Sequence, residues 1–67
     1  MRDAEMKKAV ADLLRQVSHT AQGEIEKHLK KALAAGRLEA VHDLPVAVTL
    51  RSKQLDLDVT IHSRIDL

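Results

Sequence analysis

Histidine and glutamate are the residues of this chain best suited to bind a metal, because the sequence has four histidines and no cysteine. Glu24 and His28 have the i, i+4 spacing that places two ligands on one face of a helix. His19 and His42 fall in expected connections and His62 falls in an expected strand, so no second histidine shares that spacing. We therefore expect ordinary surface histidines, with no metal site and no cofactor.

Two carboxylates and a neighbouring histidine and serine are further candidates for catalysis. Asp56 and Asp58 alternate along an expected strand, which places them roughly 6.7 Å apart on one face. Carboxylates at such a distance can act as acid and base, but a flat, solvated strand face offers them no pocket. His62 and Ser63 are neighbours on the same strand and point to opposite faces, so they do not form a base and nucleophile pair. The sequence predicts no catalytic residues and no enzyme activity.

A group of basic residues offers a possible contact to a phosphate backbone. Its members are Lys27, Lys30, Lys31, Arg51 and Lys53. The three lysines also suit the C-terminal half of a helix, whose negative dipole end they complement, while Glu24 and Glu26 lie in the first half. The i, i+4 spacing of Glu26 and Lys30 adds an ion pair. A solvated helix face is therefore the favoured interpretation, and nucleic-acid binding stays open as the alternative.

The composition indicates a small folded domain without a membrane span or aromatic binding platforms. The chain has 67 residues, of which 45% are hydrophobic and 31% charged, as in a small folded domain. The absence of Phe, Trp and Tyr removes the stacking platforms that bind single-stranded nucleic acids. No cysteine is present, and no apolar stretch is long enough for a signal peptide or a membrane span. We expect a cytoplasmic protein without membrane association or a small-molecule ligand.

The first half of the chain has helical spacing. The residues that carry it are Met6, Val10, Leu13, Leu14 and Val17, then Ile25, Leu29, Ala32 and Leu33. Asp3 is a suitable cap for a first helix, and residues 18–20 predict a break. Thr20 would cap a second helix of about residues 20–35, which ends at Gly36 in a left-handed conformation.

The second half alternates with a period of two, as strands do. Its apolar residues are Leu44, Val46, Val48 and Leu50, then Leu55, Leu57, Val59, Ile61, Ile65 and Leu67. The first row is even-numbered and the second odd-numbered, so residues paired across a hairpin must sum to an odd number and the loop has an even length. We predict a four-residue loop over 52–55, with Arg51 opposite Asp56. Pro45 indicates the start of a strand or an outward position on an edge strand.

These elements predict one α+β domain over residues 1–67, in which two helices are followed by an antiparallel β-hairpin and pack on one face of the sheet. A two-stranded sheet has two open edges, and its core is small for a chain of this length. We therefore expect a non-catalytic protein–protein interaction module that forms a homodimer through the hairpin, with Val59, Ile61 and Ile65 at the association edge. The alternative is a small nucleic-acid-binding protein that uses the basic helix face and the hairpin loop.

Several short segments spread over most of the chain carry a family resemblance. They are residues 20–26 (TAQGEIE), 36–38 (GRL), 44–46 (LPV), 49–50 (TL) and 65–67 (IDL). With these segments the chain resembles a family of short bacterial proteins of unknown function. The resemblance implies the same helical and hairpin architecture, and it implies no activity, cofactor or site residue.

Overall fold

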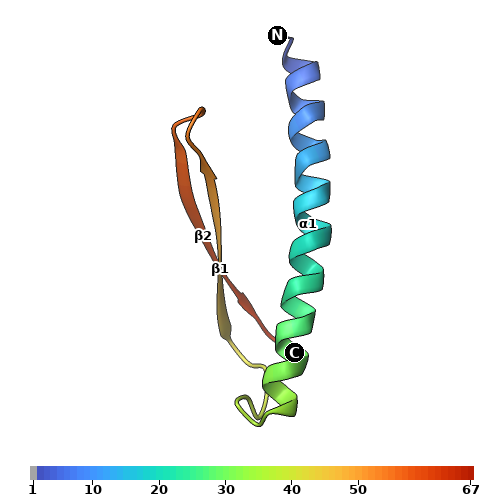
Figure 1. The fold of residues 1–67 in the computed structure, drawn as a ribbon, viewed down its shortest axis with the longest axis vertical. Helices are drawn as coiled ribbons and strands as arrows, with labels where there is room; N and C mark the ends of the chain where they lie inside the picture. Colours follow the sequence, from blue (N-terminus) through green and yellow to red (C-terminus); the bar gives the residue numbers. More distant parts are fainter. Residues whose placement is uncertain (1) are drawn as a thin grey trace. The chain divides into compact units, whose positions relative to one another are not determined.

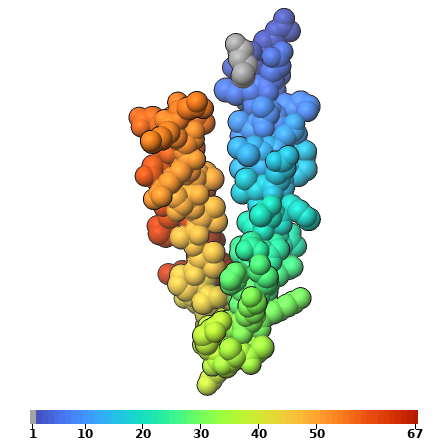
Figure 2. All heavy atoms as spheres, viewed as in Figure 1, coloured from blue at the N-terminus to red at the C-terminus, as the bar shows by residue number. Residues whose placement is uncertain are grey.

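The structure is a computed structural model that describes residues 2–67. Its elements in chain order are α1 (Asp3–Ala34), β1 (Leu44–Ser52) and β2 (Leu57–Ile65), as Figure 1 shows. The α+β class is therefore confirmed. The chain divides into two compact units, a helix unit that ends at Arg37 and a hairpin unit over Leu38–Leu67. Figure 2 shows the same two units with all heavy atoms, the helix unit from blue to green and the hairpin unit from yellow-green to red.

The helix unit contains one continuous helix of 32 residues, so the prediction of two helices separated at residues 18–20 is wrong. Ser, His and Thr each disfavour a helix by only a few tenths of a kcal/mol, and neither Gly nor Pro stands at those positions. The apolar stripe also continues across the expected break. Its residues are Val10, Leu13, Val17, Ala21, Ile25, Leu29 and Ala32, with a mean step of about 3.7 residues, close to the helical repeat.

The sequence predicted the C-terminal end of α1 correctly but not its N-terminal cap. The residue that precedes the helix is Arg2, whose side chain makes no capping hydrogen bond, so the prediction of Asp3 as the cap is wrong. Asp3 lies in the first turn, where its charge complements the positive end of the helix dipole. At the other end Gly36 has a φ of 73°, as expected. The Gly36 N–H donates to the Leu33 carbonyl at 3.2 Å and the Arg37 N–H donates to the Ala32 carbonyl at 2.9 Å, which is the Schellman arrangement.

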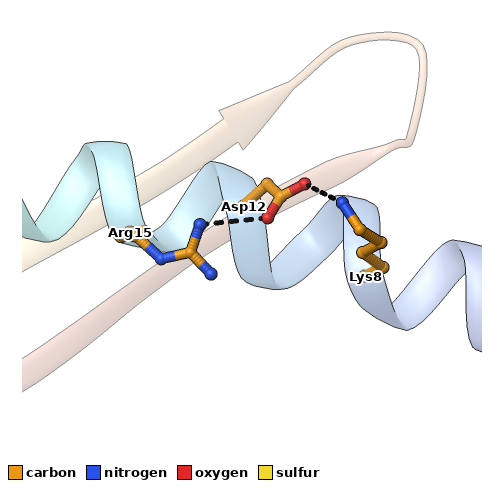
Figure 3. Close-up of polar contacts among 3 residues, drawn as sticks. All are labelled: Lys8, Asp12 and Arg15. Carbon is orange, nitrogen blue, oxygen red and sulfur yellow. Dashed lines mark hydrogen bonds and ion pairs between the residues drawn. The ribbon is translucent and has the colours of Figure 1, made fainter.

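Ion pairs between neighbouring turns lie on the surface of α1. Asp12 accepts hydrogen bonds from Lys8 Nζ at 3.0 Å and from Arg15 Nη1 at 3.1 Å (Figure 3). Such exposed pairs contribute only about 0.3–0.5 kcal/mol each. None of the described side chains of α1 is buried, so this unit has no core of its own.

The hairpin confirms the parity rule, because every pair from Leu44↔Ile65 to Ser52↔Leu57 joins residues of opposite parity. The loop has four residues, as predicted, but it covers 53–56 instead of 52–55. Arg51 consequently lies opposite Asp58, and the prediction that it faces Asp56 is wrong.

A left-handed residue at the end of the loop explains this shift. Asp56 has a φ of 52°, and aspartate adopts that conformation more readily than leucine, which would occupy the same place in a loop over 52–55. The Asp56 N–H donates to the Lys53 carbonyl at 3.2 Å, and the Leu55 N–H donates to Ser52 Oγ at 3.4 Å. These bonds close the turn, and Leu55 within it is 73% exposed.

The second strand is shorter than residues 55–67, because β2 begins at Leu57 and ends at Ile65. Beyond β2 the Leu67 N–H donates to the Val41 carbonyl at 2.9 Å and joins the two ends of the hairpin unit. Val41 is the one buried hydrophobic residue among residues 2–67, at 5% exposure. Pro45 is the second residue of β1, in agreement with its expected place near the start of a strand.

Candidate association surface

One face of the hairpin is apolar and contains all three residues expected at the association edge. On this face Val48 pairs with Ile61, Leu50 with Val59 and Leu44 with Ile65. Val59 is 47% exposed and Ile61 is 50% exposed, while Ile65 is half-buried. Strand alternation places these side chains together because residues two apart share a face. The hairpin thus carries a row of β-branched side chains along β2 that its own unit does not bury.

The opposite face of the hairpin is polar and is linked by cross-strand contacts. Thr49 and Thr60 share a hydrogen bond of 3.1 Å between their hydroxyl oxygens, and Arg51 Nε lies 3.4 Å from Asp58 Oδ1. The carboxylate of Asp58 is exposed, so it can accept further hydrogen bonds. This face therefore stays solvated, and its cross-strand contacts help to order the two strands.

The open end of the hairpin carries a histidine–carboxylate hydrogen bond and an ion pair that the sequence alone did not suggest. His42 Nδ1 lies 2.8 Å from Asp66 Oδ1, and Arg64 Nη1 lies 3.2 Å from Asp43 Oδ2. Asp43 has a φ of 54°, which shifts the chain by one residue relative to the strand register. Extension of the strand register beyond Leu44 would place Asp43 opposite Asp66, whereas His42 lies beside Asp66 in the structure. The left-handed conformation of Asp43 accounts for this one-residue offset.

The basic residues proposed to contact nucleic acid fall into the two separate units. Lys27, Lys30 and Lys31 lie in the last turns of α1, and Lys27 Nζ is 2.9 Å from Glu24 Oε2. Arg51 and Lys53 line a shallow depression at the turn of the hairpin. Its other lining residues are Ser52, Asp56, Leu57 and Asp58, so two carboxylates balance the two cations there.

The pKa of Glu24 is lowered by a neighbouring side chain on α1. The Glu24 carboxylate accepts a hydrogen bond from the Lys27 ammonium, and this bond together with the charge of Lys27 lowers its pKa below the ordinary value. His28 Nε2 lies 4.0 Å from Glu24 Oε1, at the limit of an ion pair. Residues 2–67 contain no cluster of three or more metal-binding side chains. The lowered pKa of Glu24 therefore follows from side chains on one turn of α1.

The two aspartates considered for acid and base chemistry do not share a strand face. Asp56 lies in the turn and Asp58 in β2, opposite Arg51. The expectation that both stand on one strand is therefore wrong, because the loop begins one residue later than predicted. Within the described residues, no helix is long and apolar enough to cross a membrane.

Comparison with known proteins gives a family and no function. A search of curated proteins and a search of solved structures each found no match. A family model described as a family of unknown function, DUF6494, matches residues 1–67. This match confirms the resemblance to an uncharacterised family that the short segments indicate. The chain belongs to the family of unknown function DUF6494.

Proposed function

We propose that this protein is a non-catalytic protein–protein interaction module of the cytoplasm that forms a homodimer through its hairpin. The observation that carries the proposal is the apolar face of the hairpin, on which Val48, Val59 and Ile61 remain more than a third exposed. An isolated two-stranded hairpin is marginally stable in water. Pairing with a second copy covers apolar surface and satisfies backbone groups at the sheet edge at the same time.

Burial of the apolar face also requires a second layer. The stripe along α1 has the same chemical character as the apolar face of the hairpin, and α1 is amphipathic over its whole length. We propose that a helix packs on this face of the sheet, because two-layer packing is how small α+β domains build a core. A helix of the same copy and a helix of the partner would bury the apolar face equally, because both carry the same apolar stripe.

A binding role is favoured over catalysis by where the polar groups lie. Arg51, Asp58 and the threonine pair stand on a flat strand face and remain exposed. Side chains on a flat, exposed face do not converge around a reacting atom. An exposed apolar row beside an open sheet edge is instead typical of surfaces that bind protein.

Sedimentation over a wide concentration range tests the proposal. Interference optics are needed because the chain has no Trp or Tyr. We expect the unmodified chain to sediment as a dimer, and Ile61→Lys to weaken the association at least tenfold, since it places a charge on the apolar face. Thr49→Lys is the matched control, because it adds the same charge to the polar face and should leave the dimer intact. A chain that remains monomeric at every concentration overturns the proposal.

Titration with nucleic acid separates this function from the alternative. We expect neither duplex nor single-stranded DNA or RNA to bind at about 50 mM salt, where even non-specific binders show affinity through counterion release. A complex whose affinity falls steeply with salt, and falls further when Lys30 and Lys31 are replaced by Gln, would instead favour the basic helix face as the functional surface.

A further inference from the structure

We infer that β2 pairs with β2 of a second copy as an antiparallel neighbour in one register, centred on Ile61. This inference rests on the proposed homodimer and specifies which atoms form it. In this register residue i lies opposite residue 122 − i of the partner, so all nine residues of Leu57–Ile65 overlap. The result is a four-stranded antiparallel sheet that crosses the two-fold axis of the dimer.

The two edges of the hairpin differ in their backbone donors. Pro45 has no N–H, so its pair with Arg64 belongs to the positions that exchange no hydrogen bonds within the hairpin. The Leu67 N–H is directed toward the Val41 carbonyl, which is consistent with odd-numbered residues of this strand facing β1. The backbone groups that face away from β1 on β2 are therefore those of Asp58, Thr60, His62 and Arg64.

These outward groups define the proposed register. A two-fold axis at Ile61 places Asp58 opposite the partner's residue 64 and Thr60 opposite the partner's residue 62, so all four outward residues of each copy exchange both backbone hydrogen bonds. This gives about eight inter-chain bonds. β1 offers a poorer edge, because Pro45 leaves one of its outward positions without a donor.

Charge supports the same register independently of the backbone. Asp58 and Arg64 are the only formally charged residues within β2, and they stand at equal distances on either side of Ile61. The two-fold axis therefore places each Asp58 opposite an arginine of the partner, twice in the dimer. Asp58 would then lie between Arg51 of its own hairpin and an arginine of the second copy, and opposite charges across adjacent strands are stabilising.

Neighbouring registers lose one or both advantages. In the proposed register the numbers of two paired residues add up to 122. A register with a sum of 121 or 123 would place apolar side chains opposite polar ones, so it is disfavoured. A register with a sum of 124 places Asp58 opposite a second aspartate, at position 66. A register with a sum of 120 places Arg64 opposite Asp56, which has a φ of 52° and lies outside β2. The register centred on Ile61 alone combines full overlap with opposite charges.

Single cysteines test the register directly, since the natural chain has none. Ile61 lies opposite its own copy at a position without hydrogen bonds, where Cα atoms are about 4.5 Å apart and a disulfide can form. Val59→Cys is the matched control, because Val59 lies on the same face at nearly the same exposure, yet its two copies would be roughly 13 Å apart. Under oxidised glutathione we expect Ile61→Cys to cross-link at least tenfold faster than Val59→Cys, at protein concentrations where the natural chain is dimeric.

A charge exchange gives a second measurement that does not depend on thiols. Asp58→Arg and Arg64→Asp each place like charges opposite one another in a homodimer, and each should weaken self-association about tenfold. A mixture of the two variants restores opposite charges at both positions, so we expect a heterodimer at concentrations where each variant alone is monomeric. Circular dichroism of each variant checks that the strands still form.

The outcomes separate the register from the proposed function. Equal or faster cross-linking of Val59→Cys, or a mixture that associates no better than the single variants, overturns the register while the homodimer stands if the natural chain sediments as a dimer. Absence of cross-linking in Ile61→Cys under those conditions has the same meaning. A natural chain that is monomeric at every concentration overturns both proposals.

Discussion

The helix unit and the hairpin unit differ in the sequence separation of the residues that their backbone contacts join. Hydrogen bonds in α1 join residues four apart, and its ion pairs join residues three or four apart, as in Lys8 with Asp12. Pairing in the hairpin joins residues as distant as Leu44 and Ile65, so its geometry depends on one turn. A helix tolerates a residue of low helix propensity, because the contacts of the neighbouring turns remain. A hairpin does not adjust in this way, because a change at the turn moves the strand pairing by whole residues.

This difference explains why the same kind of residue has different effects in the two units. Ser18, His19 and Thr20 are weak helix formers that lie inside α1 without interrupting it. In the hairpin a single left-handed residue, Asp56, moves the loop by one position and changes every cross-strand pair. A helix therefore needs a strong stop signal, while a hairpin responds to one favourable turn residue.

Ala21→Pro gives the largest expected effect and tests the continuity of α1. Proline in a helix interior removes a hydrogen bond and clashes with the preceding turn, at a cost of about 3 kcal/mol. If a second helix began after Thr20, Ala21 would be its first residue, where proline is well tolerated. We expect a large loss of helical signal in far-ultraviolet circular dichroism and a clearly lower melting temperature.

Ala4→Pro is the control for this substitution, because Ala4 lies in the first turn of α1, where backbone N–H groups have no partner inside the helix. It should leave the helical content nearly unchanged. A variant Ala21→Pro with the helical content of the natural chain would show that two helices meet near Thr20 after all.

Much of the fold was predictable from the sequence because the signals were periodic. Alternation indicated the existence of both strands, the parity of their pairing and the even length of the loop, and Gly36 indicated the end of the helix. The continuity of α1 through residues 18–20 was not predictable, since helix propensities there differ by less than the free energy of the surrounding turns. The position of the loop depended on a preference of Asp56 that a count of apolar residues does not contain.

The candidate surface was predictable to the same extent. Val59, Ile61 and Ile65 share one face because strand alternation has a strict period of two. The pairs of His42 with Asp66 and of Arg64 with Asp43 were not, because the positive φ of Asp43 displaces the chain beyond the strands. Side chains inside regular elements were thus predicted better than those at their ends.

Asp56→Val should have the second largest effect and act on the hairpin alone. A β-branched residue in the left-handed region costs about 1–2 kcal/mol, so we expect a lower melting temperature of the hairpin unit. Asp56→Gly is the matched variant, because glycine adopts a φ of 52° without strain and should preserve the stability. Strand signals in nuclear magnetic resonance would report both. Equal losses in the two variants would show that the carboxylate of Asp56, and not its backbone conformation, determines the loop.

The two glycines provide a prediction of opposite signs within one unit. Gly23→Ala should stabilise α1 by about 1 kcal/mol, because Gly23 lies in the helix and a Cβ there meets no atom within 4 Å. Gly36→Ala should destabilise the unit by about 1 kcal/mol, because Gly36 has a φ of 73°. Thermal unfolding followed at 222 nm measures both changes. Two shifts of the same sign would contradict the assignment of Gly36 as the left-handed end of the helix.

The smallest effect concerns Glu24 and shows how little one exposed pair contributes to the helix. The hydrogen bond and charge of Lys27 lower the pKa of Glu24, so their stabilisation is present above the pKa of the unfolded chain and is lost as the pH falls through the folded value. Lys27→Met removes both causes, and we expect the pKa of Glu24, followed by the chemical shift of its side-chain carboxyl carbon, to return toward the ordinary value. Lys31→Met is the control at the next turn, and it should leave this titration unchanged. A Glu24 titration that is the same with and without Lys27 would mean that the pair seen at 2.9 Å is not maintained in solution. Because both side chains are more than half exposed, the melting temperature should change little in either variant.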